Sequence, residues 1–126
     1  MSDSLIYVKA FNNLLISFNE ELVKLFPSDI DIKAFKRGTQ FLVDNNMRKP
    51  LQLFNEFVNE EFKIKIKKRD NSFFLENDYS SIKKQSDIEL SDIILKLKNY
   101  WADLSDNNKN NIWEYLNNLV KIAELI

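Results

Sequence analysis

The residues of this chain that are best suited to chemistry are cations gathered near its middle. Five of them fall within seven positions, and two more follow across a polar segment: Lys63, Lys65, Lys67, Lys68, Arg69, Lys83 and Lys84. Ammonium and guanidinium groups at this density can hold phosphates, and each contact steepens the salt dependence of binding. The cluster therefore predicts a nucleic-acid-binding surface as one candidate function.

Carboxylates close to the cluster favour a simpler interpretation. Glu60, Glu61 and Asp70 flank it in the sequence, and Glu76 and Asp78 follow, so they would weaken its field. Lysines near the end of a helix also complement the helix dipole. We therefore expect solvation and capping as the main role of these cations, with nucleic-acid contact as the alternative.

Three aromatic residues are candidate interface anchors: Trp113, Phe73 and Phe74. Trp113 falls beside the apolar stripe set by Ile112 and Leu116, so it either packs within the monomer or remains exposed for a partner. We favour burial of Trp113. If Phe73 and Phe74 are exposed, they could stack on unpaired bases next to the cations.

The composition argues against an enzyme. The chain has no His and no Cys, which removes the commonest general base and every thiolate, and its single Gly cannot build a phosphate loop. Adjacent acids such as Glu60 and Glu61, or Glu76 and Asp78, are typical of solvated charge. The sequence predicts no catalytic residue, no cofactor and no metal site.

Apolar residues recur at helical spacing along nearly the whole chain, which predicts an all-α fold. A chain of 126 residues fits one domain, 1–126, with a substantial core. We expect a bundle of about five helices with an irregular connection over 68–86. The expected helices cover residues 4–26, 29–44, 49–67, 87–104 and 106–126.

The last two predicted helices are expected to organise the fold. Ser86 and Glu89 form a capping-box pattern at the start of this region, and a short polar turn, Ser105–Asn108, lies between the two helices. Such a short turn predicts that the two helices pack on each other as an antiparallel hairpin.

Several local features refine this prediction. Pro27 ends the first helix, and Ser28 is expected to cap the second. Gly38, four residues after Ala34, predicts a close helix crossing, with a ligand site as the less favoured alternative. The alternating segment 62–67 could form a strand, but we expect it to end the third helix, and residues 72–75 to form a short helical turn.

Five segments carry a resemblance to known proteins. They are FNNLLISFNEELVKLFP (11–27), Asp31–Lys33, Phe73–Tyr79, Asn110–Leu116 and Leu119–Leu125. In this order they resemble a group of small, uncharacterised all-helical proteins of nucleocytoplasmic large DNA viruses, the giant viruses. The resemblance implies a viral origin and an intracellular setting, in the host cytoplasm or the virion. It transfers no functional residues.

These observations favour a non-enzymatic protein-interaction or assembly module that binds a protein partner or a second copy of itself. Membrane insertion is not expected, because the apolar stretch 5–26 is interrupted by Asn, Glu and Lys. With a net charge of −1, the chain has no global field that would attract nucleic acid.

Overall fold

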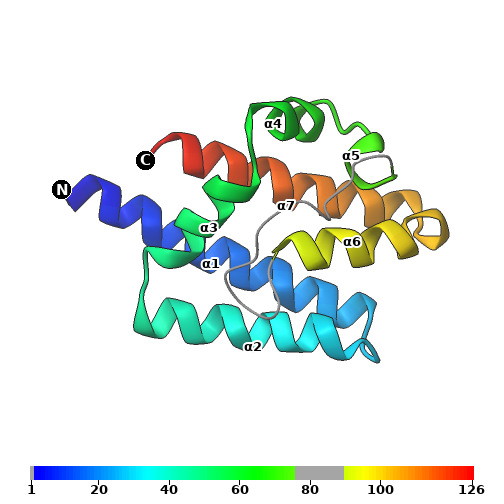
Figure 1. Ribbon diagram of the computed structural model, residues 1–126, viewed down its shortest axis with the longest axis horizontal. Helices are drawn as coiled ribbons and strands as arrows, with labels where there is room; N and C mark the ends of the chain where they lie inside the picture. The colour runs from blue at the N-terminus through cyan, green and yellow to red at the C-terminus, as the bar shows by residue number, and fades with distance from the viewer. Residues whose placement is uncertain (1, 76–89) are drawn as a thin grey trace.

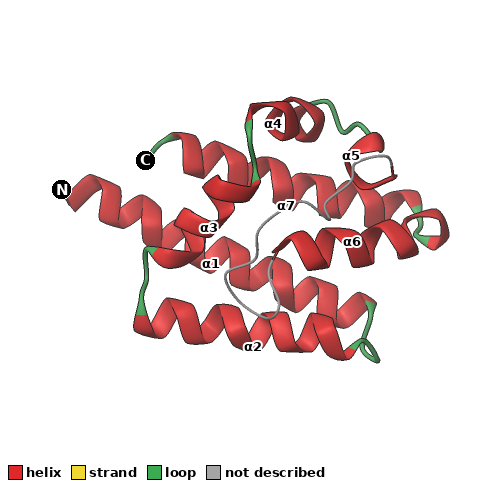
Figure 2. Cartoon of the chain, in the orientation of Figure 1, coloured by secondary structure: helices red, strands yellow, loops and turns green. Residues whose placement is uncertain are grey.

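Helix is the only regular secondary structure in the part of the chain that the computed structural model describes, residues 2–75 and 90–126. These ranges hold α1 (Ser2–Leu25), α2 (Ile30–Asn45), α3 (Lys49–Phe57), α4 (Glu60–Lys67), α5 (Ser72–Leu75), α6 (Leu90–Tyr100), the 3-10 turn η1 (Trp101–Asp103) and α7 (Asp106–Glu124) (Figures 1 and 2). The all-α class is confirmed, but the seven α-helices exceed the predicted number of about five.

The predicted third helix, 49–67, is two helices. Val58 ends α3 in an extended conformation, with φ −89° and ψ 92°. The side chain of Asn59 then accepts a hydrogen bond of 2.9 Å from the backbone N–H of Phe62 and so caps α4. An N-cap satisfies a donor that the first helical turn leaves open, so Asn59 favours a new helix start. The alternating segment after it is helical, as expected.

A defined turn ends α4 and leads to α5. Arg69 adopts φ 53°, its N–H bonds to the carbonyl of Ile66, and the N–H of Asp70 bonds to the carbonyl of Lys65. This pair of bonds is a Schellman motif, which ends a helix by satisfying its last carbonyls. The predicted turn at 72–75 is confirmed as α5. The Ser86–Glu89 capping box lies outside the described residues.

The central helix pair is α1 and α7. They run antiparallel along each other, so both chain ends lie at the same end of the molecule (Figure 1). α7 also contacts α4, whereas α6 packs against α2, α3 and α5. The predicted tight hairpin of the last two helices is therefore wrong in its pairing, although the two helices are consecutive and antiparallel.

Aromatic rings from α5 explain this difference. The ring of Phe74 stacks on Trp101 of η1 with centroids 4.2 Å apart, and it contacts Trp113 of α7 at 5.0 Å. Phe74 thus inserts where η1 leads into α7. The wide apolar stripe of α7 is left to face α1, whose core residues include Phe11 and Phe18.

The core is one cluster, and it contains most of the predicted stripe residues. Two residues of α1 depart from what residue type alone would indicate. Tyr7 is 36% exposed while its neighbour Val8 is fully buried. The polar Asn12 is buried, and its amide Nδ2 donates a hydrogen bond of 2.8 Å to the carbonyl of Met47.

Candidate functional site

The predicted basic edge, defined as residues 63–69, is matched by carboxylates. Lys63 and Lys65 pair along α4 with Glu60 at 3.3 Å and Glu61 at 3.7 Å. Two further pairs reach α7: Lys67 Nζ lies 2.9 Å from Glu124, and Arg69 lies 2.6 Å from Glu114. Exposed ion pairs add little stability, but they neutralise the field that phosphates would sense.

The remaining cations of this prediction add little to the edge. Lys68 is exposed and follows α4. Its positive charge and that of Lys65 act on Asp70, whose pKa is lowered mainly by the hydrogen bond from the backbone of Ser72. Lys83 and Lys84 lie outside the described residues. The basic edge is therefore a mixed-charge surface and not an isolated positive patch.

The three predicted interface anchors are buried. Phe73 and Phe74 have no exposed surface, and Trp113 is almost as completely covered. The Trp113 ring meets Trp101 edge-on at 5.6 Å, and the indole Nε1 of Trp101 donates to the side chain of Asn71 at 3.1 Å. These rings form core contacts, so the alternative that they anchor a partner or stack on bases is wrong for this fold.

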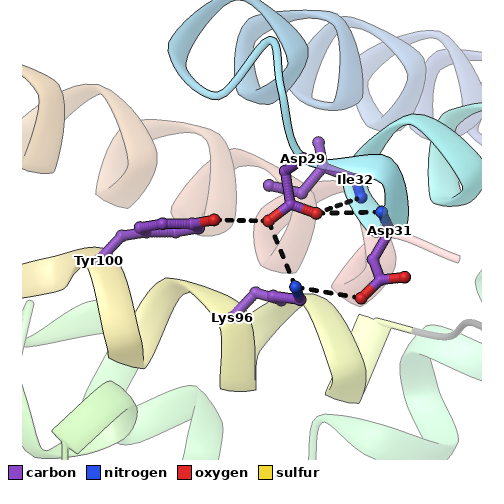
Figure 3. A network of polar contacts seen from close by, with 5 residues as sticks. All are labelled: Asp29, Asp31, Ile32, Lys96 and Tyr100. Carbon is purple, nitrogen blue, oxygen red and sulfur yellow. Dashed lines mark hydrogen bonds and ion pairs between the residues drawn. The ribbon is translucent and has the colours of Figure 1, made fainter.

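A polar network joins the start of α2 to α6 (Figure 3). Asp29, and not the expected Ser28, is the N-cap of α2: its Oδ1 accepts from the backbone N–H groups of Asp31 and Ile32 at 3.0 and 3.2 Å. Its Oδ2 accepts from the hydroxyl of Tyr100 at 2.6 Å and lies 3.4 Å from Lys96 Nζ. Lys96 also pairs with Asp31 at 3.1 Å.

The protonation states in this network follow from its contacts. Burial alone would raise the pKa of Asp29, but the hydrogen bonds from Tyr100 and Ile32 and the charge of Lys96 outweigh it, so the pKa is lowered. The hydrogen bond to Asp29 raises the pKa of Tyr100, and the bond to Asp31 raises that of Lys96. Near neutral pH Asp29 is therefore a carboxylate, Tyr100 a neutral phenol and Lys96 an ammonium.

This network lines an open cleft of about 690 Å³ beside the α1–α2 turn. Catalysis there would need a group able to give or take a proton near pH 7, and each shift moves the group away from that range. Within the described residues, no three acidic side chains come together as metal ligands do. The observed contacts of this network join α2 to α6.

A row of small and apolar residues begins at Ile30, which also lines this cleft, and continues along the side of α2 that faces away from the described core. Ile30, Ala34, Gly38 and Phe41 follow one another at spacings of four, four and three residues, so they share one side of the helix. Ile30 is 76% exposed and Phe41 is 66% exposed. Figure 1 shows α2 along one edge of the molecule, with its inner side against α1, α3 and α6. We call these four residues the outer face of α2.

Gly38 lies in the middle of this outer face. No heavy atom outside its own helix neighbourhood lies within 4 Å of where a Cβ would stand, and its φ is not positive. The close crossing that we predicted at Gly38 is therefore absent within the described chain. The small residues Ala34 and Gly38 instead leave a flat, open surface between two large apolar side chains.

One flank of this face is basic. Lys33, Lys36 and Arg37 line a groove of about 340 Å³ together with Val23 and Gln40. None of the three cations forms an ion pair with another described residue. The carboxylate farther along this flank, Asp44, accepts a hydrogen bond of 3.0 Å from the Gln40 amide. We call Lys33, Lys36 and Arg37 the basic flank of α2.

The basic flank was missed at the sequence level because its three cations are fewer than those of the 63–69 cluster. A usable signal was present. Lys33 and Arg37 are four residues apart and lie beside the exposed positions, whereas the acids near this helix gather at its start and end, at Asp29, Asp31 and Asp44.

Comparison with known proteins adds no assignment. No protein-family model, curated protein or solved structure matches this chain, so the resemblance to giant-virus proteins stays a prediction. Among the described residues, no helix combines the length and apolarity that crossing a bilayer requires.

Proposed function

We propose that this chain is a non-enzymatic helical interaction module that binds a protein partner through the outer face of α2. The observation that carries the proposal is the exposure of Ile30 and Phe41 on either side of the open surface at Ala34 and Gly38. Single exposed apolar residues are ordinary, but apolar residues aligned on one helix face are typical of a docking surface.

The chemistry of the polar groups supports a binding role over catalysis. The most connected carboxylate, Asp29, is occupied by the α2 cap and by Tyr100, and Lys96 is held between Asp29 and Asp31. These groups stabilise the position of α2 on α6. A helix fixed in this way presents its outer face in one orientation, which lowers the entropy cost of binding.

A partner protein fits this face better than a second copy of the chain. Two copies packed antiparallel through α2 would place the basic flank of one against that of the other, and like charges repel. Light scattering at high concentration tests this point, and we expect a monomer in isolation.

The test of the proposal is proximity cross-linking in expressing cells. A photoreactive amino acid placed at Gln40, which borders the outer face, should give discrete cross-linked bands. The double variant Ile30→Asn/Phe41→Asn should lose those bands while keeping its helical circular dichroism.

The matched control is Ile64→Asn/Leu95→Asn, which changes two exposed apolar residues on α4 and α6. It should leave the bands unchanged. Loss of the bands in both double variants, or in neither, would contradict docking through the outer face of α2.

A further inference from the structure

We infer that the partner of α2 is an amphipathic helix with carboxylates along one side, seated on the outer face with its acids against Lys33, Lys36 and Arg37. This inference rests on the proposed function and names the chemistry of the partner. It combines three observations on α2: exposed apolar side chains at Ile30 and Phe41, small residues between them, and a basic flank that pairs with no carboxylate among the described residues.

The shape of the face suits a helix. Ile30 and Phe41 are eleven residues apart, which is about 16 Å along the α2 axis at the helical rise. Ala34 and Gly38 lie between them and carry almost no side chain. Small residues at a contact let two helix axes approach to about 8 Å, the near end of the usual range. The large side chains at the two ends then flank the crossing.

An extended segment would gain less from this surface. Strand addition requires an exposed sheet edge with free backbone groups, whereas the backbone of α2 is hydrogen-bonded within its own helix. The contacts that α2 offers are side-chain contacts at helical spacing. A groove-binding helix uses such contacts through apolar anchors at similar spacing.

The positive charge of the basic flank favours a partner whose facing side chains are negatively charged. Lys33 and Arg37 are four residues apart and line the same groove. Lys36 and Gln40 are also four residues apart and line it as well. Glutamates four residues apart on a neighbouring helix would match this spacing. The basic edge differs in this respect. There Lys67 and Arg69 pair with Glu124 and Glu114, whereas no carboxylate among the described residues pairs with Lys33, Lys36 or Arg37.

Nucleic acid could also bind Lys33, Lys36 and Arg37, but it would leave the apolar part of the surface uncovered. Three cations can contact only a few phosphates, which gives weak and strongly salt-dependent binding. The exposed ring of Phe41 could stack on one base, but Ile30 at the other end of the face has no ring, and its side chain would remain in water against a phosphate backbone. An acidic amphipathic helix covers both the apolar stripe and the charges.

The experiment measures fluorescence anisotropy of the full chain with two designed helical peptides that share one apolar stripe. One peptide carries Glu on its flanks and the other carries Lys at the same positions. We expect the acidic peptide to bind at least tenfold more tightly at about 50 mM salt, where screening of the charges is modest. The charge reversal Lys33→Glu/Arg37→Glu should invert this preference.

The matched control is Lys9→Glu/Lys121→Glu, which changes the net charge equally at exposed sites on α1 and α7. It should leave the preference for the acidic peptide intact. Equal binding of the two peptides would overturn the inference, as would an equal effect of the control reversal. Binding of an oligonucleotide that depends on Lys33 and Arg37, without preference for the acidic peptide, would assign the flank to nucleic acid.

The two proposals fail in different ways. In one case Ile30→Asn/Phe41→Asn abolishes the cellular cross-links, whereas the charge reversal changes neither the cross-links nor the peptide preference. That result would support docking through the outer face and contradict an acidic partner. If neither double variant changes the cross-links, both proposals are wrong.

Discussion

The hydroxyl of Tyr100 donates a hydrogen bond of 2.6 Å to the carboxylate of Asp29, and so joins the end of α6 to the first turn of α2. The same carboxylate caps α2 through its other oxygen. One side chain therefore fixes both where α2 begins and what α2 packs against. Any partner that docks on α2 depends on this contact for the orientation of the helix.

The first prediction concerns the Tyr100 hydroxyl. Tyr100→Phe keeps the ring stacked on Phe26, with centroids 4.3 Å apart, and removes only the donor to Asp29. Hydrogen bonds to charged groups contribute about 1.5–3 kcal/mol, so the free energy of unfolding should fall by a comparable amount. Urea denaturation measures this change.

Tyr115→Phe is the control for that experiment. The Tyr115 ring stacks on Phe18 at 5.3 Å in a similar way, and its hydroxyl has no hydrogen-bond partner among the described residues. Its loss should change the unfolding free energy by less than about 0.5 kcal/mol. Equal costs for the two variants would argue against a special role for the Asp29 contact.

The second prediction concerns acid stability. The folded-state pKa of Asp29 lies below its ordinary value of 3.8, so the folded chain binds a proton there less readily than the unfolded chain does. The stability contributed by this carboxylate is present above that value and is lost as the pH falls through the folded pKa. Asp29→Asn should flatten the acid side of the stability profile, measured by urea denaturation at a series of pH values.

At alkaline pH the sign is the opposite. The pKa values of Tyr100 and Lys96 are raised above 10.0 and 10.5, so their contributions are present below these values and are lost as the pH rises through the folded pKa. Asp29→Asn should also weaken this alkaline loss. A variant profile parallel to that of the wild type at both ends would contradict the linkage.

Much of the helical core could be predicted from residue spacing. Leu116 and Leu119 recur with the period of a helix and both are buried, because an apolar stripe has to be covered. Which helix covers it does not follow from the period. The stripe of α7 packs on α1, since Phe74 occupies the space that a hairpin with α6 would need.

The candidate site was harder to predict, for a reason of the same kind. A charge is visible in the sequence, but its partner is not, because Glu114 and Glu124 reach Arg69 and Lys67 only after α7 packs beside α4. The outer face of α2 is defined by the lack of a covering helix in the described chain. Helix order alone does not reveal which stripe stays uncovered.

The third prediction concerns Gly38. A Cβ at this position would meet no heavy atom within 4 Å, and the backbone is in an ordinary helical conformation. Gly38→Ala should therefore raise the free energy of unfolding by about 0.4–1 kcal/mol, because alanine loses less conformational entropy on folding. Thermal unfolding followed by circular dichroism measures the gain. A loss of stability in the Gly38→Ala variant would contradict the open geometry at this position. Gly38→Leu tests binding instead: it should retain the fold and weaken the binding of a helix that packs closely on the outer face.

The fourth prediction concerns a buried amide on α1. Asn19 is 1% exposed, and neither its Oδ1 nor its Nδ2 has a hydrogen-bond partner among the described residues. A buried polar group left unsatisfied costs about 1–3 kcal/mol, so replacing it with an apolar residue of similar shape should remove that cost. Asn19→Leu should therefore stabilise the protein in urea denaturation.

Asn12→Leu provides the comparison. Asn12 lies two turns earlier on the same side of α1. Its Oδ1 also has no partner among the described residues, but its Nδ2 donates to the carbonyl of Met47. This variant should be destabilised, because it strands that carbonyl. If both substitutions destabilise to the same extent, the amide of Asn19 is satisfied in solution and the prediction is wrong.

The fifth prediction separates the two basic surfaces with nucleic acid itself. Four of the five cations of the 63–69 edge, all but Lys68, pair with Glu60, Glu61, Glu114 and Glu124. Phosphates would therefore have to displace carboxylates that already lie within 4 Å. We expect no binding of single-stranded or duplex oligonucleotides at about 50 mM salt, where phosphate contacts are strongest.

The double variant Glu114→Gln/Glu124→Gln removes the ion-pair partners of Arg69 and Lys67 and leaves every cation of the edge unchanged. If this variant gains salt-sensitive binding that the wild type lacks, the ion pairs are what suppress it. The prediction is contradicted if the wild type binds the oligonucleotide and Lys67→Gln/Arg69→Gln abolishes this binding. That result would support a nucleic-acid function for the edge, because cations neutralised by ion pairs are not expected to bind phosphates.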